Sequence, residues 1–351
     1  MGVERKAVPA QPGRPRPRPP AQAVRGRGRA AGPAPRASAE PPAVRYVTVG
    51  LEFAGQRLDN FLIRLSKGVP KSHIYQVVRS GQVRINGGRA TADQRLAAGD
   101  QIRIPPMRIG SQTDAPAVPE GSMLPVVFED EHLLVVDKPA GVAAHGGSGI
   151  SFGVIERIRA ARPNQPFLEL VHRLDRDTSG LLLLAKSRRA LLQLHAMLRE
   201  GQIEKHYLTL VAGRWLNDRQ HVKLALSRGA GGPAGKVRVD AEGGSASHTV
   251  FELRERFEQF ALLDAELRTG RMHQIRVHLT HLRFPIVGDD KYGDFEMNRK
   301  VARGEFGPRL SRMFLHAWRV RLQHPVSSEP IAFTSPLPSE CEAFLEALRG
   351  A

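Results

Sequence analysis

The densest group of side chains that could carry chemistry lies at residues 171–180. The segment reads Val-His-Arg-Leu-Asp-Arg-Asp-Thr-Ser-Gly, so it combines two carboxylates, two guanidinium groups, an imidazole and two hydroxyls. An apolar run precedes it and another, Leu181 to Leu184, follows it. A polar loop held between two buried strands presents its side chains at a sheet edge, as a catalytic site requires. A structural turn, in which Asp175 and Asp177 cap backbone N–H groups and pair with the arginines, explains the same residues.

Histidine and cysteine residues give no pattern of metal ligands. His273, His278 and His281 are spaced by five and three residues, which does not match a common zinc motif, and no carboxylate shares their helix face. The single cysteine, Cys341, excludes an internal disulfide and any multi-cysteine metal site. We therefore expect no metal site.

The elements that would position the polar loop lie in a domain that we place at residues 123–351. Strand and helix signals alternate there, and their scatter favours a mixed α+β sheet over regular βαβ winding. The expected strands are 133–136, 167–174, 181–185, 207–211, 249–253 and 262–267. The expected helices are 152–161, 188–199 after a Ser187 cap, and 273–282.

A smaller module is expected at residues 45–106. Apolar residues recur with helical spacing from Leu58 to Leu65, and Ser72 is expected to cap a second helix that Gly81 ends. Between positions 57 and 103 there are nine Lys and Arg residues but three acidic ones. Two short helices and a small sheet with a basic face favour an RNA-docking module, and a solvated basic surface is the alternative.

Two segments lack the large apolar side chains of a packed core. Residues 1–44 hold ten prolines, nine Lys or Arg and two Glu, and we expect a disordered basic arm. The arm either adds non-specific affinity for RNA or only solvates the chain. Residues 107–122, rich in Ser, Gln, Ala, Pro and Gly, are expected to form a linker.

The charge of the chain indicates a polyanionic partner. The formal net charge is +17, of which the arm contributes +7, so the rest of the chain is basic in its own right. Nucleic acid is the usual partner of such a chain, because each phosphate contact releases condensed counterions. A membrane would attract this charge too, but there is no basic amphipathic helix, lipidation motif or apolar run of about 20 residues. We expect a cytoplasmic protein with no membrane partner.

Residues 172–180 resemble the sequence motif of the RNA pseudouridine synthases that act on ribosomal and transfer RNA, and all nine positions fit. Further matches in the family's order are Asp-Lys-Pro-Ala-Gly at 137–141 with His-Gly-Gly at 145–147, Lys-His-Tyr at 205–207, Thr-Gly-Arg-Met-His-Gln-Ile-Arg-Val-His at 269–278 and Gly-Asp-Asp-Lys-Tyr-Gly at 288–293. Residues 55–59 with Ser72 resemble an RNA-binding domain of the ribosomal-protein S-four type. The matches cover about residues 45–335. Asp137 and Met272 depart from the family, which usually has Asn and Thr or Ser there.

The resemblance implies a pseudouridine synthase catalytic domain with a mixed, mainly antiparallel sheet, preceded by the S-four-type domain. It implies that a flipped uridine is cut from its ribose and rejoined through carbon 5, which needs no cofactor because no atom is gained or lost. Asp175 would be the catalytic carboxylate, attacking ribose or uracil or removing a ribose proton. Arg276 would favour its ionised form, and Tyr207 would stack on the displaced base and assist proton transfer at carbon 5.

RNA contacts are expected in both domains. Arg173 and Arg176 would bind flanking phosphates or fill the position that the base vacates, with Arg176 facing RNA more than Arg173. The residues of the small module that we expect to contact RNA are Arg57, Lys71, Arg79 and Arg84. The resemblance implies that the partner is 23S ribosomal RNA or a ribosome-assembly intermediate, and we expect a monomer. The alternative is a catalytically silent RNA-binding ribosome-assembly factor, whose basic module and arm carry the function.

Overall fold

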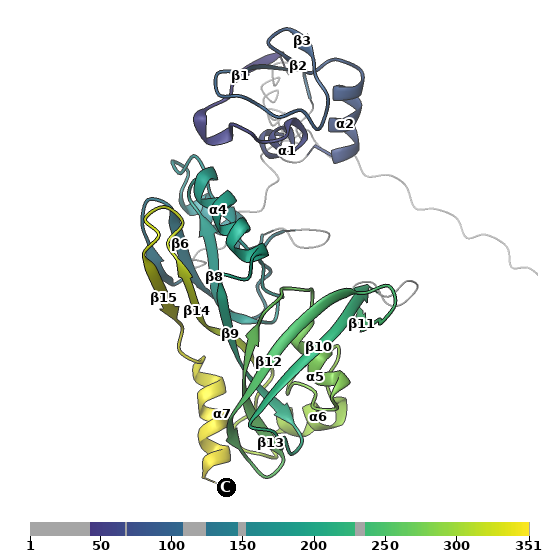
Figure 1. Cartoon of the computed structure of the whole chain (residues 1–351), viewed down its shortest axis with the longest axis vertical. Helices are drawn as coiled ribbons and strands as arrows, with labels where there is room; N and C mark the ends of the chain where they lie inside the picture. Colours follow the sequence, from purple (N-terminus) through teal and green to yellow (C-terminus); the bar gives the residue numbers. More distant parts are fainter. Residues whose placement is uncertain (1–42, 67–68, 108–123, 147–151, 229–235, 351) are drawn as a thin grey trace, which may run out of the picture. The chain divides into compact units, whose positions relative to one another are not determined.

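The computed structural model describes residues 43–66, 69–107, 124–146, 152–228 and 236–350 (Figure 1). The expected basic arm at 1–44 lies outside these ranges except for its last two residues. The expected linker at 107–122 lies outside them except for its first residue. The described residues fold into two parts, an N-terminal module and a C-terminal domain.

The described residues of the N-terminal module form a small sheet and two α-helices. Its elements are β1 (Arg45–Thr48), η1 (Leu51–Phe53), α1 (Leu58–Leu65), α2 (Lys71–Arg79), β2 (Arg84–Ile85), β3 (Gly88–Arg89) and β4 (Gln101–Ile104). The strand order is β1-β4-β2-β3 and each pair is antiparallel. Leu58 and Phe61 of α1 pack in one core with Ile74 of α2 and Ile102 of β4, which is the helix face that the sequence predicts.

Helix α2 begins at Lys71, two residues earlier than a Ser72 cap allows, so that prediction is wrong. Pro70 is the residue before the helix, and its carbonyl oxygen accepts the backbone N–H groups of His73 and Ile74. The fixed φ of proline suits a helix start, and Ser72 then lies within the first turn, where it is exposed.

The C-terminal domain is built on one long mixed sheet. Its strands are β5 (Val126–Glu129), β6 (Leu133–Lys138), β7 (Glu169–Leu170), β8 (Ser179–Ala185), β9 (Glu204–Ala212), β10 (Arg219–Arg228), β11 (Val237–Val239), β12 (Ser245–Arg256), β13 (Phe260–Leu267), β14 (Leu315–Gln323) and β15 (Pro330–Thr334). The order is β11-β10-β12-β13-β9-β14-β8-β6-β5, with β15 beside β14 and β7 beside β8. Strands β14 and β8 are parallel, and the other described pairs are antiparallel, so the expected mixed, mainly antiparallel α+β domain is confirmed.

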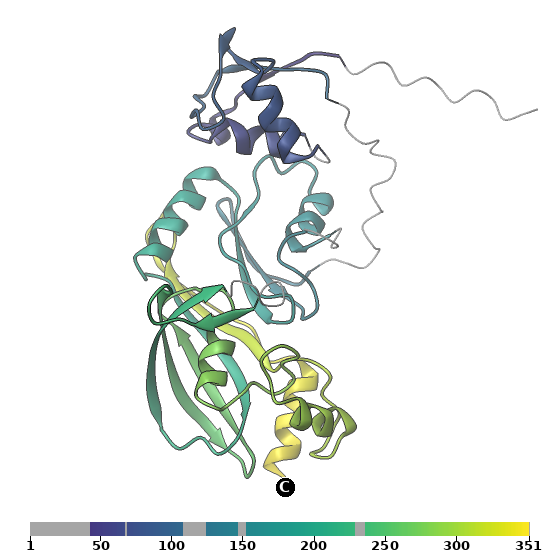
Figure 2. The ribbon, with the colours of Figure 1, turned by 90° about the vertical axis from the view of Figure 1, so that its right-hand side faces the viewer.

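The helices that the structure describes in this domain are α3 (Val154–Ala161), α4 (Arg188–Arg199), α5 (Gln274–His281), α6 (Phe295–Arg303) and α7 (Ser339–Arg349). Figures 1 and 2 show α5 and α6 together beside the part of the sheet that contains β10 to β12. Helix α4 has the predicted bounds, and the Ser187 hydroxyl accepts the N–H of Ala190 as the expected cap. In the described ranges no helix is long and apolar enough to cross a membrane.

The polar loop is held between β7 and β8, and the strand predicted over 167–174 is too long. Pairing with β8 stops at Leu170, beyond which Val171 makes one further backbone bond and the chain turns, with the Thr178 N–H donating to the Asp175 carbonyl. Gly180, the second residue of β8, follows the loop and has a φ of +105°. A Cβ there would lie 2.3 Å from the carbonyl oxygen of Ala317 on β14, so only glycine lets the loop enter the sheet at this point.

Candidate active site

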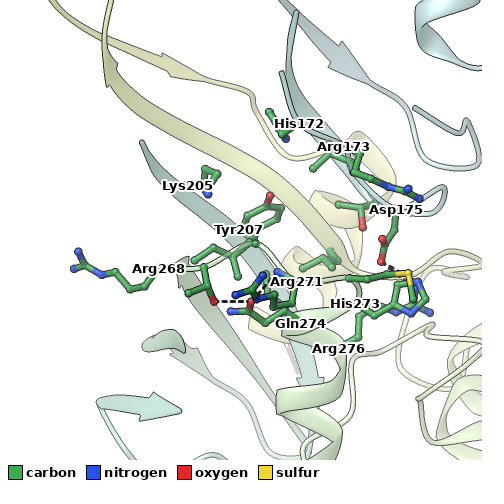
Figure 3. Close-up of a pocket in the computed structure, with 18 of the residues that line it drawn as sticks. His172, Arg173, Asp175, Lys205, Tyr207, Arg268, Arg271, His273, Gln274 and Arg276 are labelled. Carbon is green, nitrogen blue, oxygen red and sulfur yellow. Dashed lines mark hydrogen bonds and ion pairs between the residues drawn. The ribbon is translucent and has the colours of Figure 1, made fainter. Parts of the chain in front are cut away.

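A cavity of about 580 Å³ opens between the polar loop, strand β9 and the start of helix α5. Of the described residues that line it, one is acidic, Asp175, and the cationic ones are Arg173, Arg199, Lys205, Arg228, Arg268, Arg271 and Arg276. Figure 3 shows most of these side chains around the same space. A concave site with one carboxylate and many cations fits a polyanionic ligand on which that carboxylate acts.

Asp175 and Arg276 form an ion pair in this cavity. The Arg276 Nη1 group donates to Asp175 Oδ2 at 3.2 Å. The side chain of Arg276 is 4% exposed and that of Asp175 is 20% exposed. Arg276 lies in the first turn of α5, as predicted. The hydrogen bond fixes the position of the Asp175 carboxylate in the cavity, as a nucleophile or base requires.

Arg276 is held in place by a second carboxylate, Asp289, for which the sequence alone predicts no role. The guanidinium donates two parallel hydrogen bonds to it, from Nε and Nη2, each 2.7 Å long. Asp289 also accepts the backbone N–H groups of Lys291 and Tyr292 at 2.9 Å. Burial by itself would lower the pKa of Arg276, but the hydrogen bonds and charge of Asp289 raise it above its ordinary value. The bidentate pair fixes the plane of the guanidinium, so that Nη1 remains directed at Asp175.

The turn that carries Asp289 requires a glycine before it. Gly288 has a φ of +76°, and a Cβ on it would lie 2.0 Å from the carbonyl oxygen of Arg312. The chain therefore reaches the buried side of Arg276 only because this position has no side chain.

His273 is a further neighbour of the Asp175 carboxylate. Its Nε2 atom lies 3.7 Å from Asp175 Oδ2, and its Nδ1 atom is 2.8 Å from the hydroxyl of Tyr292. That hydroxyl already accepts the N–H of Val237 at 2.8 Å, so its own proton is available for Nδ1. Burial lowers the pKa of His273, although the charge of Asp175 opposes the shift. We assign a neutral ring that carries its proton on Nε2, on the side of the carboxylate.

Tyr207 lines the same cavity from strand β9. It is 6% exposed and belongs to the main core cluster, and its neighbours across the strands are Ala265 and Ala317. Burial, and then the charge of Asp175, raise the pKa of the phenol above its ordinary range, so the hydroxyl stays protonated. The structure thus brings together Asp175, Tyr207 and Arg276, which come from three separate segments of the sequence (Figure 3).

The two arginines of the polar loop differ in position. Arg173 is exposed and lines the cavity. Arg176 is exposed to solvent and is not among the described residues that line the cavity. Its Nε group donates a hydrogen bond to Asp177 at 3.0 Å. This placement does not favour the expectation that Arg176 faces a ligand more than Arg173 does.

The basic residues predicted in the N-terminal module also differ. Lys71, Arg79 and Arg84 are exposed, and Arg84 donates to the carbonyl oxygen of Gly87 at 3.2 Å. Arg57 is only partly exposed and forms an ion pair with Asp59, 2.7 Å from Nη2 to Oδ2. Arg57 is therefore engaged within the module, whereas the other three present their charge to solvent.

Histidine and acidic residues form no group that could hold a metal ion within the described ranges. His278, one of the three histidines considered above, is buried, and its Nε2 atom lies 2.8 Å from the hydroxyl of Ser247. Burial lowers the pKa of His278 to about 4.

Both folded parts of the chain are similar to known proteins. The model of the RNA pseudouridylate synthase family matches residues 132–281, and that of the S4 domain matches residues 56–102. The chain is 45% identical over 312 residues to ribosomal large subunit pseudouridine synthase C of Pasteurella multocida, covering 88% of this chain and 94% of that protein. It is 43% identical over 317 residues to the protein of the same name from Escherichia coli K12, covering 89% and 99%. Among solved structures, human RNA pseudouridylate synthase domain containing 1 superposes with a TM-score of 0.52 at 26% identity, covering 67% of this chain and 98% of that one.

Proposed function

The chain belongs to the RNA pseudouridylate synthase family, and from that membership we propose that it converts specific uridines of 23S ribosomal RNA to pseudouridine. The relatives named for the large ribosomal subunit match over almost their whole length, and this supports the choice of RNA. The observation that carries the proposed chemistry is the Asp175–Arg276 ion pair beside Tyr207 in one cationic cavity.

The target uridine must leave its helix, because its glycosidic bond is inaccessible within a base stack. A cavity of about 580 Å³ is in the size range of sites that enclose small ligands, so it suits a single everted nucleotide. In this proposal the Tyr207 ring stacks on the base. Arg173 at the cavity wall binds a phosphate of the RNA strand.

The reaction then needs bond changes within one nucleotide. The bond from ribose carbon 1′ to uracil N1 breaks, the base turns, carbon 1′ bonds to carbon 5, and the carbon 5 proton leaves while N1 gains a proton. Asp175 acts as an ionised carboxylate, either as a nucleophile toward ribose or uracil or as a base toward a ribose proton. Arg276 holds that carboxylate in place through the hydrogen bond from Nη1 to Oδ2.

The test of substrate choice uses the purified full chain and three transcripts: large-subunit ribosomal RNA, small-subunit ribosomal RNA and a mixture of transfer RNAs. Pseudouridine is located by carbodiimide adducts that stop primer extension. We expect stops in the large-subunit transcript. Stops confined to transfer RNA or to the small-subunit transcript would contradict the proposed substrate.

Replacement of Tyr292 by Phe is expected to slow turnover roughly 10-fold. The imidazole of His273 then loses its hydrogen bond to the Tyr292 hydroxyl, which fixes its tautomer beside Asp175. RNA affinity should stay near the wild-type value, since Tyr292 does not belong to the described cavity lining. The check is the single-turnover rate together with the nitrogen NMR shifts of His273. An unchanged rate with an unchanged tautomer would exclude a role for this hydroxyl.

The double replacement Arg79→Ser and Arg84→Ser is expected to weaken RNA binding without lowering the rate at saturating enzyme. Each phosphate contact that is lost should reduce the slope of log affinity against log salt by about 0.7 to 0.9. Filter binding over a potassium chloride series measures that slope. Arg349→Ser, which removes a partly exposed arginine of helix α7, is the matched control and should leave the slope unchanged. Equal slopes for the wild type and the double variant would remove these two residues from the RNA interface.

A further inference from the structure

Lys205 is a buried cation in the wall of the cavity. It lies on β9 two residues before Tyr207, so both side chains point to the same face of the strand. It is 8% exposed and lines the cavity, and Figure 3 shows it beside Tyr207. The ammonium group is therefore close to the position where Tyr207 would hold a base.

This ammonium group has no hydrogen-bond or ion-pair partner among the residues that the structure describes. Asp175 is the one acidic residue among the described residues that line the cavity, and it pairs with Arg276 rather than with Lys205. His172 accepts the N–H of Leu183 at its Nε2 atom, and burial, with the charge of Lys205, lowers its pKa to about 3, so it is neutral. Nothing described at this end of the cavity compensates the charge.

A second buried lysine in the same domain shows what a structural role looks like. Lys138 is fully buried, and its Nζ atom donates to the carbonyl oxygens of Pro139, Val142 and Arg176 at 2.9, 2.8 and 3.0 Å. Its charge is thus satisfied by the fold itself. A buried charge without such partners destabilises a protein, and groups of this kind are found where a ligand supplies the missing partner.

We propose that Lys205 is a catalytic residue that donates a hydrogen bond to a carbonyl oxygen of the reacting uracil. This inference rests on the proposed function. If the bond from carbon 1′ to N1 breaks first, its electron pair stays on the base, and the charge spreads to the two carbonyl oxygens. If a nucleophile instead adds to the uracil ring at carbon 6, the charge develops on the oxygen at carbon 4. In each route left open for Asp175, a uracil oxygen gains negative charge, and a preorganised cation in a desolvated site stabilises it.

The depth of Lys205 favours the base over a phosphate group as its ligand. Arg173, Arg199 and Arg268 are exposed residues of the cavity lining and are accessible to the RNA backbone. Lys205 lies deeper, next to the buried Tyr207 ring. Burial lowers the pKa of Lys205, which increases its tendency to share a proton with a base oxygen.

The test is a single-turnover assay with the full chain in excess over a large-subunit RNA transcript labelled with tritium at uracil carbon 5. Tritium leaves when carbon 5 bonds to ribose. We expect Lys205→Met to release it roughly 100-fold more slowly than the wild type at saturating enzyme, with little change in RNA affinity. Lys205→Arg, which keeps a cation, should recover part of the rate. Lys223→Met, a change at an exposed lysine of β10, is the matched control and should react at the wild-type rate.

Thermal denaturation separates catalysis from structural support. Lys205→Met should melt at or above the wild-type temperature, because it removes an uncompensated charge. A slow variant that also melts lower would make Lys205 a structural residue and overturn the inference. A Lys205→Met variant that reacts at the wild-type rate at saturating enzyme would also overturn the inference. If that variant only bound RNA more weakly, the result would indicate that Lys205 contacts a phosphate group. A wild type that releases no tritium from any RNA would overturn the proposed function as well, whereas an active wild type with an equally active Lys205→Met overturns this inference alone.

Discussion

Replacement of Asp175 by Asn is expected to abolish pseudouridine formation while RNA binding remains close to that of the wild type. The amide has the shape of the carboxylate but neither its charge nor its basicity. Loss of a central nucleophile or base costs about 10⁴-fold or more in rate. Arg276 keeps its two bonds to Asp289, so the cavity should retain its form. Single-turnover tritium release and filter binding measure the two effects separately.

The matched control is Asp218→Asn, which neutralises a carboxylate that is 91% exposed and paired with Arg256. This variant should react like the wild type. Asp175→Asn activity within about 10-fold of the wild type would be incompatible with a chemical role for the carboxylate, since such a loss is about three orders of magnitude or more too small.

Replacement of Arg276 by Met is expected to remove both activity and much of the stability of the C-terminal domain. Asp289, which is 1% exposed, would be left as a buried charge without its guanidinium partner. Breaking a buried ion pair by removing one partner costs about 3 to 5 kcal/mol. Urea denaturation followed by tryptophan fluorescence reports on this domain, because both tryptophans of the chain, Trp215 and Trp318, lie in it.

The double variant Arg276→Met with Asp289→Leu separates stability from chemistry. An apolar pair can replace a buried ion pair with little loss of stability, so the double variant should recover part of the free energy of unfolding. The recovery is not complete, because the N–H groups of Lys291 and Tyr292 lose their acceptor. It should not recover activity, because Asp175 still lacks its cation. A single Arg276→Met variant with wild-type stability and rate would contradict the geometry described above.

The sequence predicted the elements whose patterns are strong and local. Helix α4 was predicted with its bounds and cap, because Ser187 precedes a clear amphipathic period. Strand β8 follows from an uninterrupted apolar run, and all of its residues are buried. The motifs also placed Asp175, Tyr207 and Arg276 on elements that the fold brings to one cavity. The local sequence pattern therefore predicts a helix or strand correctly where the residues of that one segment determine its structure.

The rest depended on contacts between distant segments. Strand β10 went unpredicted because its residues alternate irregularly between buried and exposed positions. Asp289 lies 13 residues after Arg276, and its pairing appears only once the Gly288 turn folds back against Arg312. Lys205 was noted within a motif, but what distinguishes it is the lack of a described partner, which no sequence pattern records. The strand predicted over 167–174 was too long for the same reason. Apolar residues continue along the sequence beyond Leu170, where the pairing of β7 with β8 stops.

Pseudouridine mapping in living cells tests most directly whether the Asp175 carboxylate drives modification of large-subunit RNA. The cells lack the natural gene and carry either the wild-type or the Asp175→Asn coding sequence. We expect particular uridines of the large-subunit RNA to be modified with the wild type and unmodified with Asp175→Asn, at equal amounts of the two proteins. Full modification of every site in the Asp175→Asn cells would contradict this role and would favour a silent RNA-binding assembly factor instead.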